Sequence, residues 1–421
     1  MPTASDIIIT GGHPLTGTVR ASGAKNSALK LMAASILAPG KTTIHNVPAI
    51  SDVALMAEVL TQLGIEVSFE KTSVTIDSST IDSFETPYEL VREMRASIAV
   101  LGPLLGHYGQ AKVSIPGGCN IGTRPLDLHY SSLEALGVVF DTESGDIIAT
   151  APHGLRGTSV FLGFPSVGAT ENLMMAPVLA KGDTVIDNAA REPEIVDLAN
   201  YLIAMGAEIN GAGNPRIVVH GVTNLKPVAD YHTIGDRIEA GTFLVAGALM
   251  GGPLTVEGID PKHLATVLEK LAQMGLLLSV SEQAITIQRQ GPIRAASIQT
   301  LPYPGFPTDL QAQFTVLDSL AEGDSTIAEN IFENRFQSAE ELVRMGASIR
   351  VHGHFAQVSG VRGLSGAPVE APDLRGGAAL VLAGLIADNE TRVSNTVHID
   401  RGYERFTEKL LSLGAQIYRE A

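Results

Sequence analysis

The stretch AALVLAGLIADN, residues 378–389, decides the fold, because nearly every residue in it is small or apolar. A helix without a polar face belongs in the interior of a protein. Short β-branched runs such as TTIHNV and TRVSNTV follow stretches of this kind and predict strands. The five further stretches are ALKLMAASILAPG (28–40), ASIAVLGPLLGHYG (96–109), ENLMMAPVLAKG (171–182), AGTFLVAGALMGG (240–252) and AQFTVLDSLAEG (312–323).

Amphipathic segments that close with a Leu-Gly or Met-Gly pair alternate with these apolar stretches. Before the first pair, Val53, Met56 and Leu60 fall on one helical face. Ser51 is the candidate N-cap of that helix. The repeat is therefore an inner helix, a strand, an amphipathic helix and a further strand or hairpin. The six closing glycines, which are 73, 69, 69, 71 and 68 residues apart, are Gly64, Gly137, Gly206, Gly275, Gly346 and Gly414.

The number of repeats and the length of the chain together predict two lobes. At 421 residues the chain is long for one domain, and six repeats exceed what a single core usually supports. We predict the α/β class, with two similar lobes of three repeats each, helices inside and sheets outside. The link between the third and fourth repeats falls near residues 222–236. It lacks low-complexity character, so we expect the lobes to face each other across a cleft, where ligand sites tend to lie.

Composition and charge argue against several classes of protein. The chain has 29 Lys+Arg against 45 Asp+Glu, a formal net charge of −16 and a pI near 5.1. This balance disfavours binding to nucleic acid or anionic lipid. The apolar runs are shorter than the roughly 18 residues needed to cross a bilayer. The N-terminal MPTASDIIITGG lacks the pattern of a secretory signal, so we expect a soluble, cytoplasmic protein with no membrane partner.

Charged residues stand at the starts of the apolar stretches, which is unusual for segments about to be buried. A helix N-terminus presents free N–H groups, so a cation beside it builds a site for phosphate or carboxylate. The alternative is that these residues only cap helices or form ion pairs between lobes. Their equivalent repeat positions favour a shared cleft. They are Lys25, Arg95, Glu171, Arg237, Glu239, Asp309, Asp373 and Arg375.

Cys119 is the single cysteine, so the chain cannot form an intramolecular disulfide. No Cys/His grouping has metal-site spacing, and we expect no metal. A lone cysteine is most often a small buried hydrophobe. In PGGCNIGTRPLDLH, however, Gly117, Gly118 and Gly122 predict a surface loop. A thiol there could donate a proton or, once ionised, attack, with Arg124 supplying a cation nearby.

Ten segments, taken in order from about residue 7 to residue 418, resemble the UDP-N-acetylglucosamine 1-carboxyvinyltransferase family. The resemblance implies two inside-out α/β barrels of three units each, which agrees with the six periods. It implies an N-terminal lobe of residues 22–233 with the Cys119 loop, a C-terminal lobe of residues 1–21 plus 234–421, and an active site in the cleft between them. The segments are SGAKNSALKLMAAS, MRASIAVLGPLL, PGGCNIGTRPLDLH, SVGATENLMM, AAREPEIVDLAN, GDRIEAGTF, GFPTDLQAQF, IFENRF, DLRGGAALVLAG and HIDRGYER.

The resemblance also implies a reaction. Members of the family transfer the enolpyruvyl group of phosphoenolpyruvate to the 3′-hydroxyl of UDP-N-acetylglucosamine by addition and elimination, and release phosphate. This is the first committed step of peptidoglycan synthesis, which serves cell-wall biogenesis, cell shape and cell division. The implied partners are these two substrates, with no metal or other cofactor, and the enzymes are targets of fosfomycin. The oligomeric state stays open.

Four residues match the catalytic positions of the family. Cys119 matches the acid that protonates the methylene carbon of phosphoenolpyruvate, and Asp309 matches the carboxylate beside the sugar hydroxyl. An alternative for Asp309 is a helix N-cap. Lys25, together with Asn26, matches the pair that meets phosphoenolpyruvate. Arg401, together with Arg124, matches the guanidinium groups that neutralise its phosphate and carboxylate.

The remaining matches concern the nucleotide sugar and the C-terminal lobe. Asp373 and Arg375 match charged active-site residues, although Asp373 could instead only pair with a nearby arginine. One departure is Phe164, where some members carry a lysine. The residues matched to uridine are Arg124, Pro125, Leu126, Asp127 and Leu128, and those matched to further nucleotide-sugar contacts are Arg95, Ser166, Val167, Gly168 and Ile331.

Three alternatives remain open. The nearest is a 5-enolpyruvylshikimate-3-phosphate synthase, which shares fold and donor but takes another acceptor; the Cys119 loop and the RPLDLH stretch argue against it. A second is a paralogue that binds without turnover, although every expected catalytic position is filled. A third is an RNA-binding protein, which the negative charge and the lack of a basic aromatic face disfavour.

Overall fold

The computed structural model describes residues 5–86, 90, 95–114, 121–122, 126–143 and 145–420. The chain divides into two compact units. Unit 1 comprises Met1–Ser22, Asn120–Thr123 and Gly235–Ala421, and unit 2 comprises Gly23–Cys119 and Arg124–Ile234. Within the described ranges, no helix is both long and apolar enough to span a membrane.

The third repeat, in unit 2, shows the pattern of the chain most plainly. Its edge strand runs parallel to the strand that follows the inner helix, and the hairpin after the outer helix adds two antiparallel strands. The sheet order is therefore β10-β11-β13-β12. In chain order the elements are β10 (Ser159–Phe161), α6 (Val167–Met175), η3 (Ala176–Leu179), β11 (Asp183–Asp187), α7 (Pro193–Ala204), β12 (Glu208–Asn210) and β13 (Arg216–His220).

The other two repeats of unit 2 build the sheets β14-β3-β5-β4 and β6-β7-β9-β8. Strand β14 (Asp230–His232) comes from the end of the unit and pairs in parallel with β3. The first repeat contains α1 (Lys25–Ala34), η1 (Ser35–Leu37), β3 (Lys41–His45), α2 (Ser51–Gln62), β4 (Glu66–Glu70) and β5 (Ser73–Asp77). The second contains β6 (Glu85–Thr86), η2 (Arg95–Val100), α4 (Leu101–Tyr108), β7 (Gln110–Ser114), α5 (Asp127–Ala135), β8 (Val139–Glu143) and β9 (Asp146–Thr150).

Unit 1 repeats the same plan in three further sheets. The fourth repeat contains α8 (Arg237–Met250), β15 (Leu254–Glu257), η4 (Pro261–Leu264), α9 (Ala265–Gln273), β16 (Leu277–Val280) and β17 (Ala284–Gln288). The fifth contains β18 (Ile298–Gln299), η5 (Thr308–Leu310), α10 (Gln311–Ser319), β19 (Asp324–Ala328), α11 (Gln337–Arg344), β20 (Ser348–His352) and β21 (Phe355–Ser359). The sixth contains β22 (Pro368–Glu370), α12 (Leu374–Ile386), β23 (Glu390–Ser394), α13 (Val397–Asp400), α14 (Phe406–Ser412) and β24 (Gln416–Glu420).

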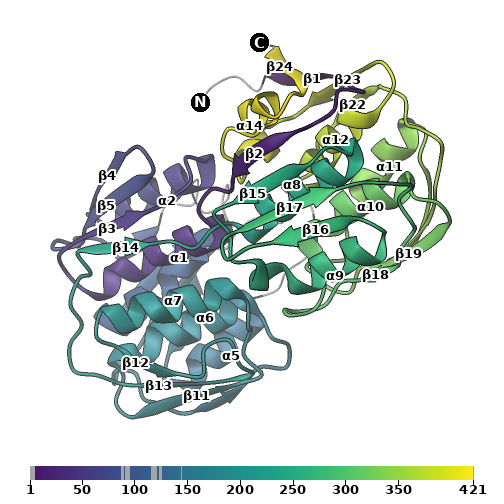
Figure 1. Cartoon of the computed structure of the whole chain (residues 1–421). Helices are drawn as coiled ribbons and strands as arrows, with labels where there is room; N and C mark the ends of the chain where they lie inside the picture. The colour runs from purple at the N-terminus through teal and green to yellow at the C-terminus, as the bar shows by residue number, and fades with distance from the viewer. Residues whose placement is uncertain are drawn as a thin grey trace. The chain divides into compact units, whose positions relative to one another are not determined.

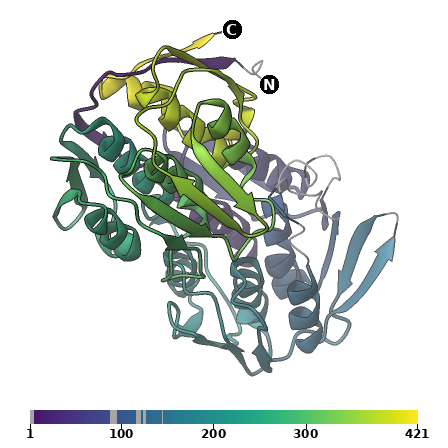
Figure 2. The same cartoon turned by 90° about the vertical axis from the view of Figure 1, so that its right-hand side faces the viewer.

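The N-terminal residues complete two sheets of unit 1. Strand β1 (Asp6–Thr10) pairs antiparallel with both β23 and β24, and its purple ribbon lies between the yellow C-terminal strands in Figure 1. Strand β2 (Gly17–Arg20) pairs in parallel with β15. Figure 2, turned by 90°, shows β1 again beside the last strand of the chain. The fourth and sixth repeats therefore borrow their missing strands from the start of the sequence.

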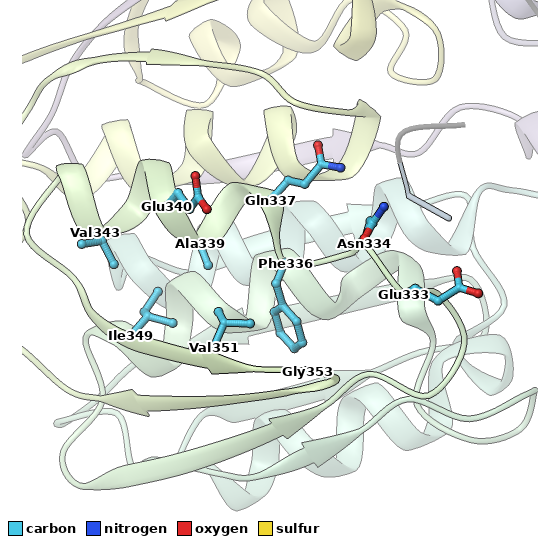
Figure 3. Close-up of a pocket in the computed structure, with 10 residues that line it drawn as sticks. All are labelled: Glu333, Asn334, Phe336, Gln337, Ala339, Glu340, Val343, Ile349, Val351 and Gly353. Atoms are coloured by element: carbon cyan, nitrogen blue, oxygen red, sulfur yellow. The ribbon is translucent and has the colours of Figure 1, made fainter. Parts of the chain in front are cut away.

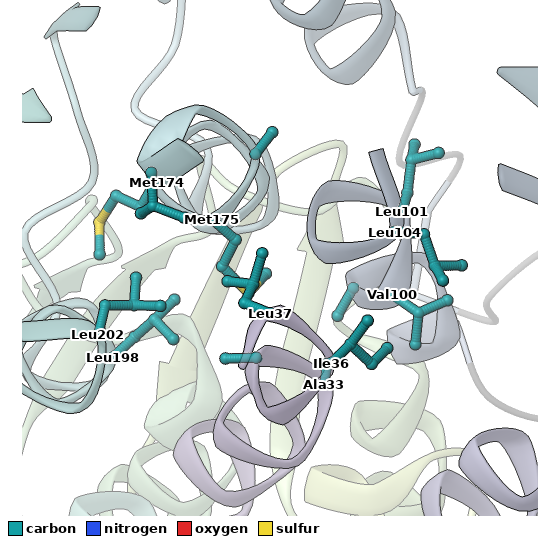
Figure 4. Close-up of a cluster of buried hydrophobic side chains, with 14 of the residues drawn as sticks. Ala33, Ile36, Leu37, Val100, Leu101, Leu104, Met174, Met175, Leu198 and Leu202 are labelled. Atoms are coloured by element: carbon teal, nitrogen blue, oxygen red, sulfur yellow. The ribbon is translucent and has the colours of Figure 1, made fainter. Parts of the chain in front are cut away.

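The inner helices are buried on all sides, as their composition predicts. Every residue of α8 and of α10 is buried, and α8, α10 and α12 contact one another in the core of unit 1. In unit 2, side chains from the first three repeats meet in the cluster of Figure 4, where Leu37, Leu104 and Met175 come from different repeats. The predicted fold class, two lobes of three repeats with helices inside and sheets outside, is confirmed.

The closing glycines have a conformational role. Each of the six follows the outer helix of its repeat with a φ between 89° and 107°. A side chain is strained in this left-handed region, by roughly 1–2 kcal/mol, and glycine is not. One expectation about these helices is wrong: α2 begins at Ser51 itself, its N-cap is Ile50, and no side chain caps it.

Candidate active site

Asp309 of unit 1 lies between two arginines that come from different repeats. Arg335, just before α11, places its Nη2 2.7 Å from Asp309 Oδ1, and Arg375, in the first turn of α12, places its Nη2 3.2 Å from Oδ2. The arginine side chains are 3% and 4% exposed, whereas 26% of the Asp309 side chain is exposed. The carboxylate of Asp309 is therefore bound by two buried cations and remains accessible to solvent.

The surroundings of Asp309 keep it ionised. Burial alone would raise the pKa of its carboxyl group, but the positive charges of Arg375, Arg335 and Arg237 outweigh burial and hold this pKa below its ordinary value. The predicted N-cap role of Asp309 is wrong, because Pro307 is the N-cap residue of η5. The group is a carboxylate at neutral pH and is in the state needed to accept a proton.

Two guanidinium nitrogens of this cluster are buried without an acceptor. Nε of Arg335 and Nη1 of Arg375 have no hydrogen-bond partner among the described residues. Buried donors are normally paired, and an unpaired charged donor is costly. The spare donors of these two cations could each meet an acceptor of an anionic ligand.

Arg375 is positioned by its own helix and by an aromatic ring. Asp373 is the N-cap of α12 and accepts hydrogen bonds from the backbone N–H groups of Arg375 (2.8 Å) and Gly376 (3.0 Å). The Arg375 guanidinium carbon lies 5.3 Å from the centre of the Tyr403 ring. The Tyr403 hydroxyl is in turn 2.9 Å from Thr242 Oγ1. Asp373 thus orients the arginine through the backbone.

Arg401 lies at the C-cap of α13, half-buried. Burial lowers the pKa of His398 on that helix, and the charge of Arg401 lowers it further, while Asp373 opposes both effects. Arg401 and Asp373 therefore belong to one electrostatic neighbourhood within unit 1. The backbone N–H of Ile331, a residue matched to the nucleotide sugar, donates to the buried Glu329.

Unit 2 carries a buried ion pair at the start of its first inner helix. Lys25 is the first residue of α1, and its Nζ lies 2.6 Å from Asp52 Oδ2. The two side chains are 11% and 5% exposed. Asn26, the next residue, is exposed. A buried ion pair of this kind holds the lysine in place, and its exposed neighbour Asn26 can approach a ligand.

Two of the predicted nucleotide-sugar segments lie against each other in unit 2. Asp127 and Leu128 begin α5, and Ser166 caps α6 through its Oγ, 3.4 Å from Ala169 N. His129 of α5 bonds Asn172 of α6 at 3.0 Å. A side chain at Gly168 would come within 3.1 Å of the His129 ring, a tight contact that glycine avoids. Leu126 is buried directly before α5, and Val167 is the first residue of α6.

Several predicted residues cannot be placed in this way. Cys119, Arg124 and Pro125 lie outside the described residues. Arg95 begins η2, but its side chain is likewise outside what the structure describes. The nearest described part of that loop is Ile121, whose carbonyl oxygen accepts from Asn334 N at 3.1 Å within unit 1.

The sequence interpretation missed two charged residues of these clusters. Arg335 stands in the IFENRF segment, which carried the resemblance but received no role, and Asp52 follows the candidate cap Ser51. A signal for both was present, because a buried cation or carboxylate requires an opposite charge. Among the described residues, no group of three or more His, Cys, Asp or Glu side chains is arranged to hold a metal ion.

A pocket of unit 1 lies next to the segment that carries Arg335, since Asn334 and Phe336 line it. It opens between α11 and the hairpin of β20 and β21, with Phe336, Val343 and Val351 on its apolar side and Glu333 and Glu340 among its polar residues (Figure 3). None of the predicted site residues lines it. The charged clusters, rather than this pocket, are therefore the candidate site.

Comparison with known proteins identifies the family. A family model described as EPSP synthase (3-phosphoshikimate 1-carboxyvinyltransferase) matches residues 9–410. The chain belongs to this family. Among individual relatives, the UDP-N-acetylglucosamine 1-carboxyvinyltransferase of Desulfosudis oleivorans is 51% identical over 98% of this chain and 99% of its own. The protein of the same name from Corynebacterium jeikeium is 50% identical over 98% of both chains. These relatives confirm the resemblance carried by the ten segments.

Solved structures confirm the architecture. The crystal structure of the enolpyruvyl transferase NikO from Streptomyces tendae has a TM-score of 0.90 and 28% identity, covering 100% of this chain and 99% of that chain. An EPSP synthase from Acinetobacter baumannii has a TM-score of 0.76 and 18% identity over the whole of both chains, and that likeness concerns the fold alone.

Proposed function

We propose that this protein transfers the enolpyruvyl group of phosphoenolpyruvate to the 3′-hydroxyl of UDP-N-acetylglucosamine and releases phosphate. Relatives named for this activity are about 50% identical to it over nearly the whole chain. The observation in the structure that best supports the proposal is the ionised Asp309 beside two arginines with spare buried donors. A carboxylate base beside an anion site is what the transfer requires.

The chemistry has two balanced steps. In the addition, Cys119 gives a proton to the methylene carbon of phosphoenolpyruvate, which makes the neighbouring carbon an oxocarbenium-like electrophile. The sugar hydroxyl attacks this carbon, and its proton passes to Asp309. In the elimination, the new methyl group returns a proton to the Cys119 thiolate, phosphate leaves with the proton held by Asp309, and the carbon–carbon double bond forms again. The product keeps the enolpyruvyl group as an ether.

The electrostatics of unit 1 support this assignment of roles. A carboxylate whose pKa is held low is ionised whenever substrate arrives. The cations that lower this pKa also favour a ligand that carries phosphate and carboxylate groups, and preorganised charges of this kind stabilise developing charge at little cost in reorganisation. Lys25 and Asn26 of unit 2, and Arg124 and Arg401, are proposed to bind the same donor. We predict that both units contribute to one active site, in the cleft between them.

The nucleotide sugar has its own proposed contacts. The close packing of α5 on α6 supports Asp127, Leu128, Ser166 and Gly168 as neighbours on one surface of unit 2. Ile331 is proposed to contact the same ligand. A role in peptidoglycan synthesis and a cytoplasmic location follow from the proposed reaction.

The main alternative acceptor is shikimate 3-phosphate, since the family includes the EPSP synthases. The solved EPSP synthase shares only 18% identity with this chain, against about 50% for the nucleotide-sugar enzymes. A paralogue that binds without turnover is the second alternative. The filled catalytic positions favour an active enzyme.

A phosphate-release assay with each acceptor tests the proposal directly. We expect release only when phosphoenolpyruvate and UDP-N-acetylglucosamine are present together. Cys119→Ala should abolish most turnover, whereas Cys119→Asp should keep a good part, because a carboxylic acid can replace the proton donor. Fosfomycin should alkylate Cys119. Release with shikimate 3-phosphate instead, or a Cys119→Ala variant as active as the parent, would overturn the assignment.

A further inference from the structure

Glu329, directly after β19, is a buried carboxylate that the proposed mechanism does not use. Its residue is 2% exposed. Four hydrogen bonds reach it, all from neutral groups. Oε1 accepts from Thr300 Oγ1 and Ile331 N, both at 2.9 Å, and from Phe332 N at 3.1 Å, while Oε2 accepts from Thr308 Oγ1 at 2.9 Å. Such a set offsets the cost of burying the carboxylate.

These bonds join three separate segments of the fifth repeat. Thr300 follows β18, Thr308 begins η5, and Ile331 belongs to the segment that leads into α11. Thr300 strengthens the link, because its Oγ1 also accepts from Asn330 N at 2.9 Å and its carbonyl oxygen accepts from Asn330 Nδ2 at 3.1 Å. One side chain therefore sets the spacing of all three segments.

Each segment leads to a residue of the candidate site. Thr308 is the neighbour of Asp309, so its bond to Oε2 fixes the turn from which the candidate base projects. The bonds to Oε1 fix Ile331, and the same segment continues to Arg335, which holds Asp309 Oδ1. Glu329 thus has one oxygen for the base and one for the nucleotide-sugar segment.

We propose that Glu329 is a positioning residue that sets the distance between the base Asp309 and the acceptor-binding segment at Ile331. This inference rests on the proposed function. Proton transfer demands that base and hydroxyl come within hydrogen-bond reach, and a misplacement of about 1 Å can cost roughly a hundredfold in rate. A carboxylate suits this role better than an amide, because only a carboxylate offers acceptors on both oxygens.

The hydrogen bonds to the two oxygens of Glu329 can be removed separately with near-isosteric variants. We call those to Oε2 the Thr308 branch and those to Oε1 the Ile331 branch. Thr308→Val removes the donor to Oε2, and we expect kcat to fall roughly tenfold to a hundredfold while KM for UDP-N-acetylglucosamine changes less than about twofold. Thr300→Val removes the donor to Oε1 and the acceptor for Asn330 N, and we expect this KM to rise about tenfold with a smaller change in kcat. Serine at either position keeps the hydroxyl and should restore the parent values.

Glu329→Gln is a third variant that tests the role of the carboxylate itself. Its amide keeps one oxygen for the Ile331 branch but presents an NH₂ group to Thr308, so it should lower kcat more than it raises KM. The exposed Thr326 on β19 offers a matched control, Thr326→Val, which should change neither constant. Calorimetric binding of UDP-N-acetylglucosamine to each variant reports on the Ile331 branch without turnover.

The outcomes separate this inference from the proposed function. If the parent protein binds and turns over the two substrates but both valine variants lose kcat and affinity alike, or serine fails to restore them, Glu329 has only a structural role. If the parent does not turn over, the proposed function itself fails. Thr308 is only half-buried and its valine variant should fold; if valine at buried position 300 prevents folding, Thr300→Ala gives the same comparison.

Discussion

Two carboxylates of unit 1 occupy comparable places in neighbouring repeats and behave in opposite ways. Glu239 lies in the first turn of α8 and is 2% exposed. In the described part of the chain it pairs with one cation, Lys409, whose Nζ is 2.5 Å from its Oε1. Asp309 lies in η5, immediately before α10, and has the charges of three arginines around it. Burial raises the pKa of Glu239 to about 7, with Lys409 opposing in part, whereas the pKa of Asp309 falls below its ordinary value.

The difference shows what decides the charge of a buried carboxylate in this fold. One cation does not outweigh desolvation, and three do. Glu171, a buried carboxylate of the inner helix of the third repeat, supports this rule, because Lys30 is its one cationic partner among the described residues and burial raises its pKa too. The repeat therefore supplies equivalent positions, and the local number of cations decides which of them can act as a base at neutral pH.

Removal of the charge of Asp309 should have the largest effect on activity. Asp309→Asn keeps the size of the side chain but cannot accept the proton, so kcat should fall by about 10²–10⁴. A coupled phosphate assay measures the loss. Asp324→Asn, at an exposed position of β19, is the matched control and should stay near the parent rate. A fall of less than tenfold in Asp309→Asn would mean that the hydroxyl proton leaves by another route.

Glu239 should affect stability rather than chemistry. A carboxyl group whose folded pKa is raised contributes stability that is fully present below its unfolded pKa of about 4.5 and is lost as pH rises through about 7. The shift corresponds to about 3 kcal/mol at most between pH 4.5 and pH 8. Glu239→Gln lacks this titration, so its free energy of unfolding should depend less on pH over that window.

Thermal unfolding at pH 5 and pH 8 measures this difference. Between pH 5 and pH 8, the melting temperature of the parent should fall by several degrees more than that of Glu239→Gln. Glu408→Gln, on the exposed side of α14 next to Lys409, controls for the loss of one carboxylate. Parallel curves for the parent and Glu239→Gln would show that Glu239 is already ionised at pH 5, and the contrast with Asp309 would disappear.

Local patterns in the sequence predict the repeats but not their long-range partners. The all-round apolar helices and the six glycines with positive φ depend on neighbours along the chain, and their periodicity is visible. The place of β1 between β23 and β24 depends on residues almost 400 positions away. The periodicity gives no sign of it, and only the resemblance to a family assigned the first residues to the C-terminal lobe.

The same division applies to the candidate site. Asp309 and Arg375 stand at the starts of inner helices, a position that repeats and can be recognised. Arg335 stands in an irregular segment, 26 residues after its partner, and no local pattern indicates which carboxylate it meets. Ser51 shows the opposite error, because a cap residue type at a helix start does not fix which backbone position it takes.

Removal of one of the cations around Asp309 should have the smallest effect on activity. It tests most directly whether the number of nearby cations decides the charge of a buried carboxylate. Arg335→Gln keeps a donor for Oδ1 but loses the charge, so the pKa of Asp309 should rise toward its ordinary value while Arg375 and Arg237 still hold it down in part. Because the base must be ionised, the acid side of the kcat profile should move to higher pH. The loss should appear as pH falls to the ordinary aspartate pKa of about 4 and below, where a rise of one pKa unit costs up to about tenfold in rate.

The control variants separate charge from packing. Arg335→Lys keeps the charge and should leave the acid side of the profile where it is in the parent, although its single point charge lacks the fork that meets Oδ1 and its overall rate should be lower. Arg344→Gln, at an exposed position of α11, should change nothing. If Arg335→Gln lowers the rate equally at every pH, Arg335 acts only by orienting the carboxylate, and the low pKa of Asp309 is due to the two remaining arginines.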